Sequence, residues 1–457
     1  MFFKNTKTNF DNMLFSKSEV NKIVFPLVAQ QILASTSGII NSIMVSNAGE
    51  AAISGVGLVS PLDLLLMYLY TALASGGAVV ISQLLGKKDI EASKSASKQL
   101  IWVVFIISSI VSLIACTFNS PILNLIFGKT DADVMKNAQD YFFFIAISYP
   151  FLGIYNAGAA IFRAMGNSKI SFTSSLLTTV VHILCNAILI FGFKMGATGA
   201  AISTTVSRLV GAVLLMVLLY KKDNIIYIEK LFKTKFESKI IKNICGIGIP
   251  NGLENSMFQF GKVITQSLVS TFGTAHIVAN SVGNTVTALQ YTAGSAIGMA
   301  MITIIGRCIG AQEKEQAKKY TNHLLKMAYA FIISISLVMC IFVKPIVGIY
   351  NLSPESSSLT IQIILTHSLC VCTIWPIAFP LPNAFRAASD VRFTMIVSIC
   401  SMWVFRVFFS YVFGKYMGMG VMGVWYAMFC DWTFRAIVFG TRYIKGVWLT
   451  KYKPLSK

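Results

Sequence analysis

Three carboxylates stand inside long apolar stretches of the sequence and are the first candidates for chemistry: Asp63, Glu254 and Asp431. At ~1.5 Å per residue, each lies roughly 15–18 Å from the start of its stretch. A charged side chain at the centre of a bilayer is costly and usually serves an ion, a proton or a substrate. We therefore take all three as candidates for binding a coupling cation or proton.

Glu254 has the most suggestive local sequence of the three. It follows Pro250 by one helical turn, and a proline removes a backbone hydrogen bond and favours a kink. Freed carbonyl groups beside a carboxylate suit a cation or a proton, and the polar Gln259 follows on the same stretch. The alternative is a structural role, in which a nearby arginine neutralises Glu254.

Asp63 and Asp431 have different neighbours. Asp63 lies between Pro61 and an apolar run, and apolar surroundings penalise the ionised form, as a proton carrier requires. A neutral hydrogen bond between helices is the alternative. Asp431 is four residues before Arg435, so the two share a helix face and can pair, which favours a structural role.

The composition places these residues in a membrane. Of 457 residues, 55% are hydrophobic and 12% are charged, and the mean hydropathy is +0.69. A soluble domain has about 25% charged residues, so soluble, disordered and coiled-coil classes are excluded. The nine cysteines show no metal-ligand or redox spacing, which favours buried thiols and no metal site.

Twelve apolar stretches are long enough to cross a bilayer as helices. They cover about 23–46, 52–85, 99–118, 138–161, 170–192, 197–220, 244–270, 277–306, 324–343, 359–384, 393–413 and 419–440. The termini and the loops after even-numbered spans hold 28 of the 38 Lys and Arg residues, and the opposite loops hold five. This asymmetry predicts that both termini are cytoplasmic. The net charge of +20 then favours contact with anionic lipid headgroups, not with nucleic acid.

Landmarks recur along the chain at a nearly constant offset, close to half of its length. They are Pro26 and Pro250, Gly86 and Gly310, Arg163 and Arg386, and Gly196 and Gly420. An even number of spans per repeat predicts two parallel six-helix halves. We expect an N-terminal lobe over 1–220, a basic cytoplasmic linker over 221–243, a C-terminal lobe over 244–440 and a cytoplasmic tail over 441–457.

Charged residues in equivalent cytoplasmic loops are candidates for a gate. Arg163 and Arg386 occupy equivalent places in the two halves, as do Glu91 and Glu315. They could form polar links that hold the cytoplasmic side closed. Solvated loop charges, worth ~0–1 kcal/mol per pair, are the alternative.

Several motifs, spread over nearly the whole chain, resemble those of MATE (multidrug and toxic compound extrusion) transporters of prokaryotes. In the first half they are Phe25-Pro26-Leu27, Met44-Val45-Ser46, Gly55-Val56-Gly57, Gly86-Lys87-Lys88-Asp89 and Phe162-Arg163-Ala164-Met165-Gly166-Asn167. In the second half they are Gly248-Ile249-Pro250-Asn251-Gly252-Leu253-Glu254 and Asn383-Ala384-Phe385-Arg386-Ala387. Each motif alone is weak, and the matching spacing in both halves makes the set specific.

The resemblance implies an all-α membrane protein whose two six-helix lobes surround a V-shaped cavity. It implies export of small organic, often cationic, compounds across the cell membrane by antiport against H⁺ or Na⁺, by a monomer without a cofactor. A related alternative is a flippase or exporter of lipid-linked or oligosaccharide substrates. A membrane-embedded enzyme or an ATP-driven pump is disfavoured, because the sequence has no nucleophile motif and no nucleotide-binding loop.

The first half departs from the family in one respect. The family typically has an aspartate in the first span, and this chain has Asn41 there. In the fifth span His182 and Asn186 occupy places where the family often has Asn and Asp, and Thr204 lies in the sixth span. We expect a polar cluster of these four residues without a carboxylate. His182 could titrate in place of one, with a hydrogen-bonded structural role as the alternative.

Overall fold

The computed structural model describes residue 10 and residues 13–47, 49–128 and 130–452. These residues form helices and connecting loops, with no strand among them. The helices of the first half are α1 (Lys17–Ser46), α2 (Glu50–Gly86), α3 (Ile90–Thr117), α4 (Asn119–Phe127), α5 (Ala132–Ile147), α6 (Tyr149–Ala164), α7 (Ser168–Asn186), η1 (Ala187–Gly192) and α8 (Gly196–Leu219). The all-helical fold class is confirmed.

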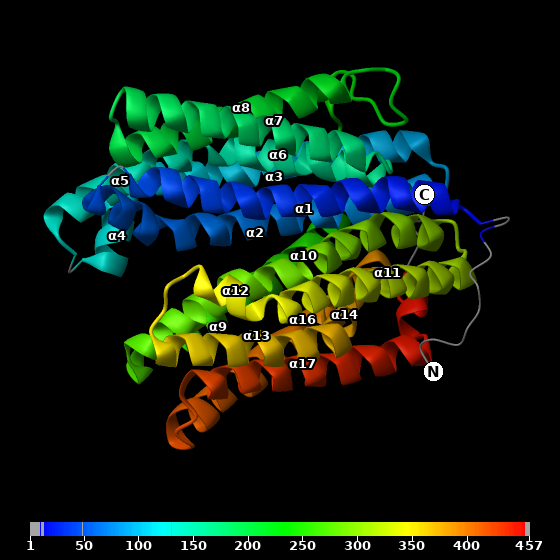
Figure 1. The fold of residues 1–457 in the computed structure, drawn as a ribbon. Coiled ribbons are helices and arrows are strands. Elements are labelled where there is room, and N and C mark those ends of the chain that lie inside the picture. The colour runs from blue at the N-terminus through cyan, green and yellow to red at the C-terminus, as the bar shows by residue number, and fades with distance from the viewer. Residues whose placement is uncertain (1–9, 11–12, 48, 129, 453–457) are drawn as a thin grey trace. The chain divides into compact units, whose positions relative to one another are not determined.

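The second half follows the segment that contains η2 (Leu231–Lys233). Its helices are α9 (Ser238–Val269), η3 (Ser270–Phe272), α10 (Thr274–Gly310), α11 (Lys314–Ile341), α12 (Val343–Gly348), α13 (Pro354–Thr373), α14 (Trp375–Ala378), α15 (Leu381–Ala387), α16 (Val391–Ser401), η4 (Met402–Phe408), η5 (Tyr411–Tyr416), α17 (Gly420–Lys445) and η6 (Val447–Thr450). Figure 1 shows the long helices of each half running side by side, such as α7 with α8 and α10 with α11.

Each expected span corresponds to a helix or to a run of helices. Nine of the described helices are long and apolar enough to cross a membrane, and a bent pair, α5 with α6, makes a tenth. The two other expected spans are α9 and α17, long helices that carry buried charged residues. The fold is therefore about twelve helices in two repeats.

Prolines explain where two expected spans are interrupted. The fourth bends by 45° between α5 and α6, just before Pro150. The tenth divides into α13, α14 and α15 around Pro376, Pro380 and Pro382. By contrast, α9 continues through Pro250 without a break, as α1 does through Pro26. The transmembrane helices therefore tolerate some prolines and break at others.

The internal repeat is visible in the ends and contacts of the helices. Both α2 and α10 end at the equivalent glycines, Gly86 and Gly310. The π-helical segments η1 and η5 also begin at equivalent positions of the repeat. Side chains 145 residues apart meet in both halves: Asp63 with Arg208, and Asn280 with Trp425. The two halves therefore share one helix packing.

The chain divides into two compact units whose boundaries lie inside α1 and α9. One unit is residues 25–252, and the other is residues 253–457 together with the chain up to Val24. In the first unit α9 crosses α2 closely, since a Cβ built on Gly76 would lie 2.6 Å from the carbonyl oxygen of Ile244. In the second unit the Tyr320 hydroxyl donates to the carbonyl of Phe15 over 2.6 Å. The start of each of these helices thus packs with the helices of the other repeat.

Candidate functional site

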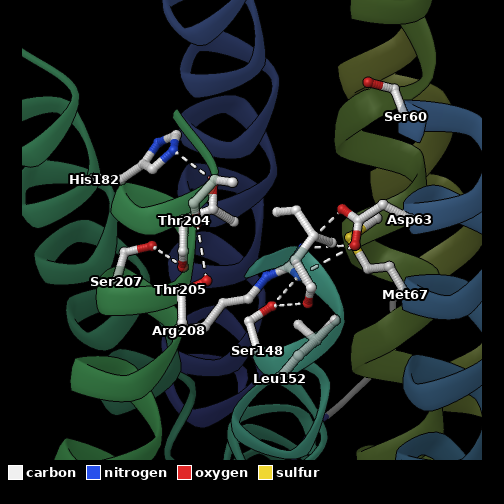
Figure 2. Close-up of polar contacts among 12 residues, drawn as sticks. Ser60, Asp63, Met67, Ser148, Leu152, His182, Thr204, Thr205, Ser207 and Arg208 are labelled. Carbon is white, nitrogen blue, oxygen red and sulfur yellow. Dashed lines mark hydrogen bonds and ion pairs between the residues drawn. The ribbon is translucent and has the colours of Figure 1, made fainter. Parts of the chain in front are cut away.

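The most complete polar arrangement in the unit of residues 25–252 is an ion pair between α2 and α8. Arg208 Nη2 lies 2.8 Å from Asp63 Oδ2 and 3.1 Å from Oδ1, and Nη1 lies 3.1 Å from Oδ1. Nη1 also donates to the hydroxyl of Ser148 at 2.7 Å. Ser148 is the residue at which α5 bends into α6. Figure 2 shows Arg208 reaching Asp63 and Ser148.

Asp63 has a cationic partner in addition to its apolar neighbours. The apolar neighbours in sequence are real, but a guanidinium from α8 contacts both carboxylate oxygens. The side chains of Arg208 and Asp63 are 12% and 18% exposed, so water screens the pair weakly. Bidentate contact of this kind between arginine and carboxylate is among the stronger hydrogen-bonded arrangements in proteins.

A cavity of about 280 Å³ lies beside the pair and is lined by Arg208. Its other walls combine apolar side chains with hydroxyl groups, and include His182, Thr204 and Ser207. His182 Nε2 lies 3.1 Å from the Thr204 hydroxyl (Figure 2). The described lining residues include no carboxylate. The cavity thus offers hydrogen bonds, one imidazole and one guanidinium.

The four polar residues expected to cluster meet as two separate pairs. Asn186 Nδ2 donates to Asn41 Oδ1 at 2.9 Å, and His182 pairs with Thr204. Asn186 also accepts a hydrogen bond from Ser203, which the sequence analysis did not single out. No carboxylate belongs to either pair among the described residues. Asn41 is therefore held by a neutral amide network.

In the other unit Glu254 pairs with an arginine from α15, the last helix of the tenth span. Arg386 Nη2 lies 2.7 Å from Glu254 Oε1, and Nη1 donates to Asn383 at 2.9 Å. The two side chains are 11% and 9% exposed. Glu254 Oε2 is buried and has no hydrogen-bond partner among the described residues. Arg386 therefore lies in α15 beside Glu254, and its role at a cytoplasmic gate stays a prediction.

The predicted pairing of Asp431 with Arg435 is confirmed. Arg435 Nε lies 2.8 Å from Asp431 Oδ1, and both side chains are almost fully buried. Ser401 also donates to Asp431 Oδ1, and Arg435 Nη2 donates to the carbonyl of Ser398 at 3.0 Å. These bonds connect α17 to α16. Asp431 Oδ2 is buried without a partner among the described residues.

The remaining candidate residues are two glutamates that pair within their own helices and two half-buried polar residues. Glu91 pairs with Lys94 at 2.8 Å, and the equivalent Glu315 pairs with Lys318 at 3.1 Å, each within one helix. Arg163 is half-buried at the end of α6. Gln259 is half-buried on α9. In the part of the chain that the structure describes, no group of three or more His, Cys, Asp or Glu residues could hold a metal ion.

Three ion-pair partners escaped the sequence analysis. They are Arg208, Arg386 and Arg442, whose Nε lies 2.6 Å from Asp390 Oδ2. Arg208 lies inside an apolar stretch, at a depth close to that of Asp63, and this depth was the available signal. The other two partners lie 132 and 52 residues away from their carboxylates in sequence. No periodicity in the sequence reports such contacts.

A bundle of membrane-spanning helices, built as two repeats with charged pairs buried inside each, defines a membrane transporter rather than an enzyme. The MatE family model matches residues 26–188 and again residues 250–412. The chain belongs to this family.

Two kinds of relatives agree with the family assignment. The probable multidrug resistance protein NorM of Thermotoga maritima is 24% identical over 441 residues, covering 94% of this chain and 93% of the relative. An outward-facing multidrug resistance MATE transporter matches with a TM-score of 0.89 and 18% identity over 95% of this chain and 96% of its own. A MOP superfamily transporter from Pyrococcus furiosus matches with a TM-score of 0.88 and 18% identity over 98% of this chain and all of its own. The description of that protein states that a reverse polarity of its binding pocket suggests a different function.

Proposed function

We propose that the chain exports small organic molecules across the cell membrane by antiport against H⁺ or Na⁺. The family assignment and the multidrug resistance names of the relatives support export. The chain would act as a monomer with both termini in the cytoplasm, where its basic loops meet anionic lipid headgroups.

The observation that carries the coupling proposal is the state of the three intramembrane carboxylates. Asp63, Glu254 and Asp431 each pair with an arginine. A proton or Na⁺ that binds such a carboxylate competes with the arginine for the same oxygens. Binding therefore frees a guanidinium, and this exchange couples the cation to a rearrangement of the helices.

Glu254 is the foremost coupling residue in this proposal. Arg386 occupies one of its oxygens, and the other is buried without a partner among the described residues. A buried unsatisfied carboxylate oxygen is costly, and a proton or a cation would relieve that cost. Asp63 follows, although Arg208 occupies both of its oxygens.

The cavity beside Arg208 is the proposed site for part of the organic substrate. Its volume of about 280 Å³ lies near the lower end of the roughly 300–1,000 Å³ found for small-molecule sites. Hydroxyl groups and His182 along apolar walls would orient a substrate without demanding a single shape. The pair of His182 and Thr204 lines this cavity, and the pair of Asn41 and Asn186 lies in the same unit.

Purified protein in vesicles tests this proposal. Ethidium transport is measured under an imposed proton gradient, an imposed sodium gradient and no gradient. We expect one of the gradients to drive transport and Glu254→Gln to abolish it, while Glu355→Gln on an exposed site leaves it unchanged. Transport that ignores both gradients, or that survives Glu254→Gln with the same ion dependence, would contradict the coupling role.

A further inference from the structure

The charges buried in the unit that contains residues 253–457 do not balance. Two carboxylates at membrane depth, Glu254 and Asp431, are each occupied by an arginine. Two further cations, Lys262 on α9 and Arg406 in η4, belong to none of the ion pairs of the described residues. These two cations are therefore left without a carboxylate, because Glu254 and Asp431 are already paired.

Both of these cations line one pocket. The pocket has a volume of about 50 Å³, and its polar walls are Lys262, Thr265, Gln266, Asn280, Asn284 and Arg406. The side chain of Trp425 forms a further wall of the pocket. Arg406 is only 8% exposed, and its guanidinium lies 5.3 Å from the ring centre of Phe258. Arg406 is thus a buried cation without a carboxylate partner, and Lys262, which is exposed, brings a second positive charge to the same pocket. Like charges on one pocket repel each other, and a bound anion would remove that cost.

Neutral hydrogen bonds hold the pocket walls in place. Asn280 Nδ2 donates to Gln266 Oε1 at 2.6 Å, and the indole of Trp425 donates to Asn280 Oδ1 at 3.0 Å. The Gln266 amide nitrogen remains available as a donor. No carboxylate lines the pocket among the described residues. Its polar walls are therefore rich in donors and suited to an acceptor with negative charge.

The pocket also occupies an equivalent place in the repeat. Arg406 stands at the position of the second repeat that His182 holds in the first, and His182 lines the cavity beside Arg208. Met428 and Thr204 are equivalent in the same way, and each lines the cavity of its own half. Each half thus places a cavity against equivalent helices, with an imidazole and a guanidinium in the first half and a guanidinium with an ammonium in the second.

We propose that the pocket at Lys262 and Arg406 binds the acid group of an organic substrate, a carboxylate, sulfonate or phosphate. The substrates would then include organic anions and zwitterions beside cations such as ethidium. The organic part would lie outside the pocket, because a volume of about 50 Å³ admits a small group only. This inference rests on the proposed export function and assigns the substrate class of that function.

Equilibrium binding to the purified chain tests this inference with three probes that share one ring. They are benzoate, benzamide and benzylammonium, which differ in the charge of the polar group. We expect benzoate to bind at least about tenfold more tightly than the other two, since hydrogen bonds to charged groups are the stronger ones. Dihexanoyl phosphatidate serves as a second arm, and tighter binding of this probe than of benzoate would assign the acid group to a lipid.

Lys262→Gln should weaken anion binding by at least about tenfold, whereas Lys415→Gln, which removes an exposed cation of the same unit, should leave it unchanged. If Arg406→Gln does not fold, Arg406→Lys takes its place as the test variant. It keeps the charge and should therefore retain part of the affinity for the anion. Equal affinity for benzoate and benzamide, preference for benzylammonium, or anion binding that ignores Lys262→Gln would overturn the inference.

This measurement is independent of the export function, because binding at equilibrium needs no ion gradient. Anion binding without gradient-driven transport would support the anion-binding pocket and overturn the export proposal. Gradient-driven ethidium transport without any anion preference at the pocket would support the export proposal and overturn the anion-binding pocket.

Discussion

At the scale of single residues, the buried ion pairs combine a large desolvation cost with an electrostatic attraction that offsets it. Removing a charge from water costs several kcal/mol, and the partner compensates only with good geometry. Asp63 and Arg208 have that geometry, with three contacts between 2.8 and 3.1 Å and a further bond to Ser148. Such a pair stabilises the protein little overall but penalises the loss of either partner strongly.

The Asp63–Arg208 pair predicts strong non-additivity. Asp63→Asn should destabilise the protein by about 3–5 kcal/mol, because it leaves the Arg208 guanidinium buried and uncompensated. The double variant Asp63→Asn, Arg208→Gln should be less destabilised than the sum of the single variants. Unfolding in detergent, followed for all four members of the cycle, measures this coupling. Additive effects would show that the two side chains do not stabilise each other.

Asn41→Asp should change the pH dependence of transport more than the stability. The new carboxyl would replace an amide that accepts from Asn186 at 2.9 Å, so its ionised form keeps that hydrogen bond. Initial transport rates across pH 5–8 provide the measurement, and Asn47→Asp on an exposed position serves as the control. Identical profiles for the variant and the unchanged protein would show that position 41 has no part in coupling.

Residue-scale predictions from the sequence succeeded where the contact is local. Asp431 and Arg435 are four residues apart in one helix, so helix geometry alone predicts their pairing. The partners of Asp63 and Glu254 lie on other helices, 145 and 132 residues away. Their identity depends on how the helices pack, which apolar periodicity does not encode.

At the scale of elements, close helix crossings depend on glycines. Gly248 of α9 lies against α2, where a Cβ would be 2.9 Å from Leu73 Cα. Gly246, two residues earlier on the same helix, has open space around its Cα. Small residues of this kind let transmembrane helices approach closely.

The two glycines make a matched test of this crossing. Gly246→Ala should be neutral or stabilising by up to ~1 kcal/mol, because alanine favours the helix. Gly248→Ala gains the same propensity but forces α9 away from Leu73, so it should lower the unfolding temperature. Thermal unfolding of both variants in detergent gives the comparison. If Gly248→Ala is as stable as Gly246→Ala, the close crossing is not needed for stability.

The elements show which features of a helix the sequence can predict. Apolar length predicted the position of every span, because the bilayer thickness sets that length. The effect of each proline could not be predicted from the sequence. Pro250 lies within a continuous helix, whereas the chain bends just before Pro150. The π-helical segments η1, η4 and η5 also went unpredicted, since a one-residue change in hydrogen bonding leaves the apolar pattern almost unaltered.

At the scale of the whole molecule, the repeat was the most secure prediction. A constant offset of landmarks follows from duplication of one helical unit, and the matching helix ends and contacts bear it out. The unit boundaries within α1 and α9 could not be read from the sequence, because they depend on which helices these long segments contact. The cavities in the two halves differ in volume, about 50 against 280 Å³, and in individual side chains such as His182 and Arg406, which the repeat does not predict.

The central claim is that organic substrate and coupling cation move in opposite directions through one protein. It is tested most directly without any imposed ion gradient, in vesicles that contain purified protein and a luminal indicator of pH or of sodium. An ethidium gradient alone should then drive the coupling ion the other way, and Glu254→Gln should abolish this counterflow while Glu355→Gln preserves it. Ethidium flux through the unchanged protein without movement of either ion would contradict the account.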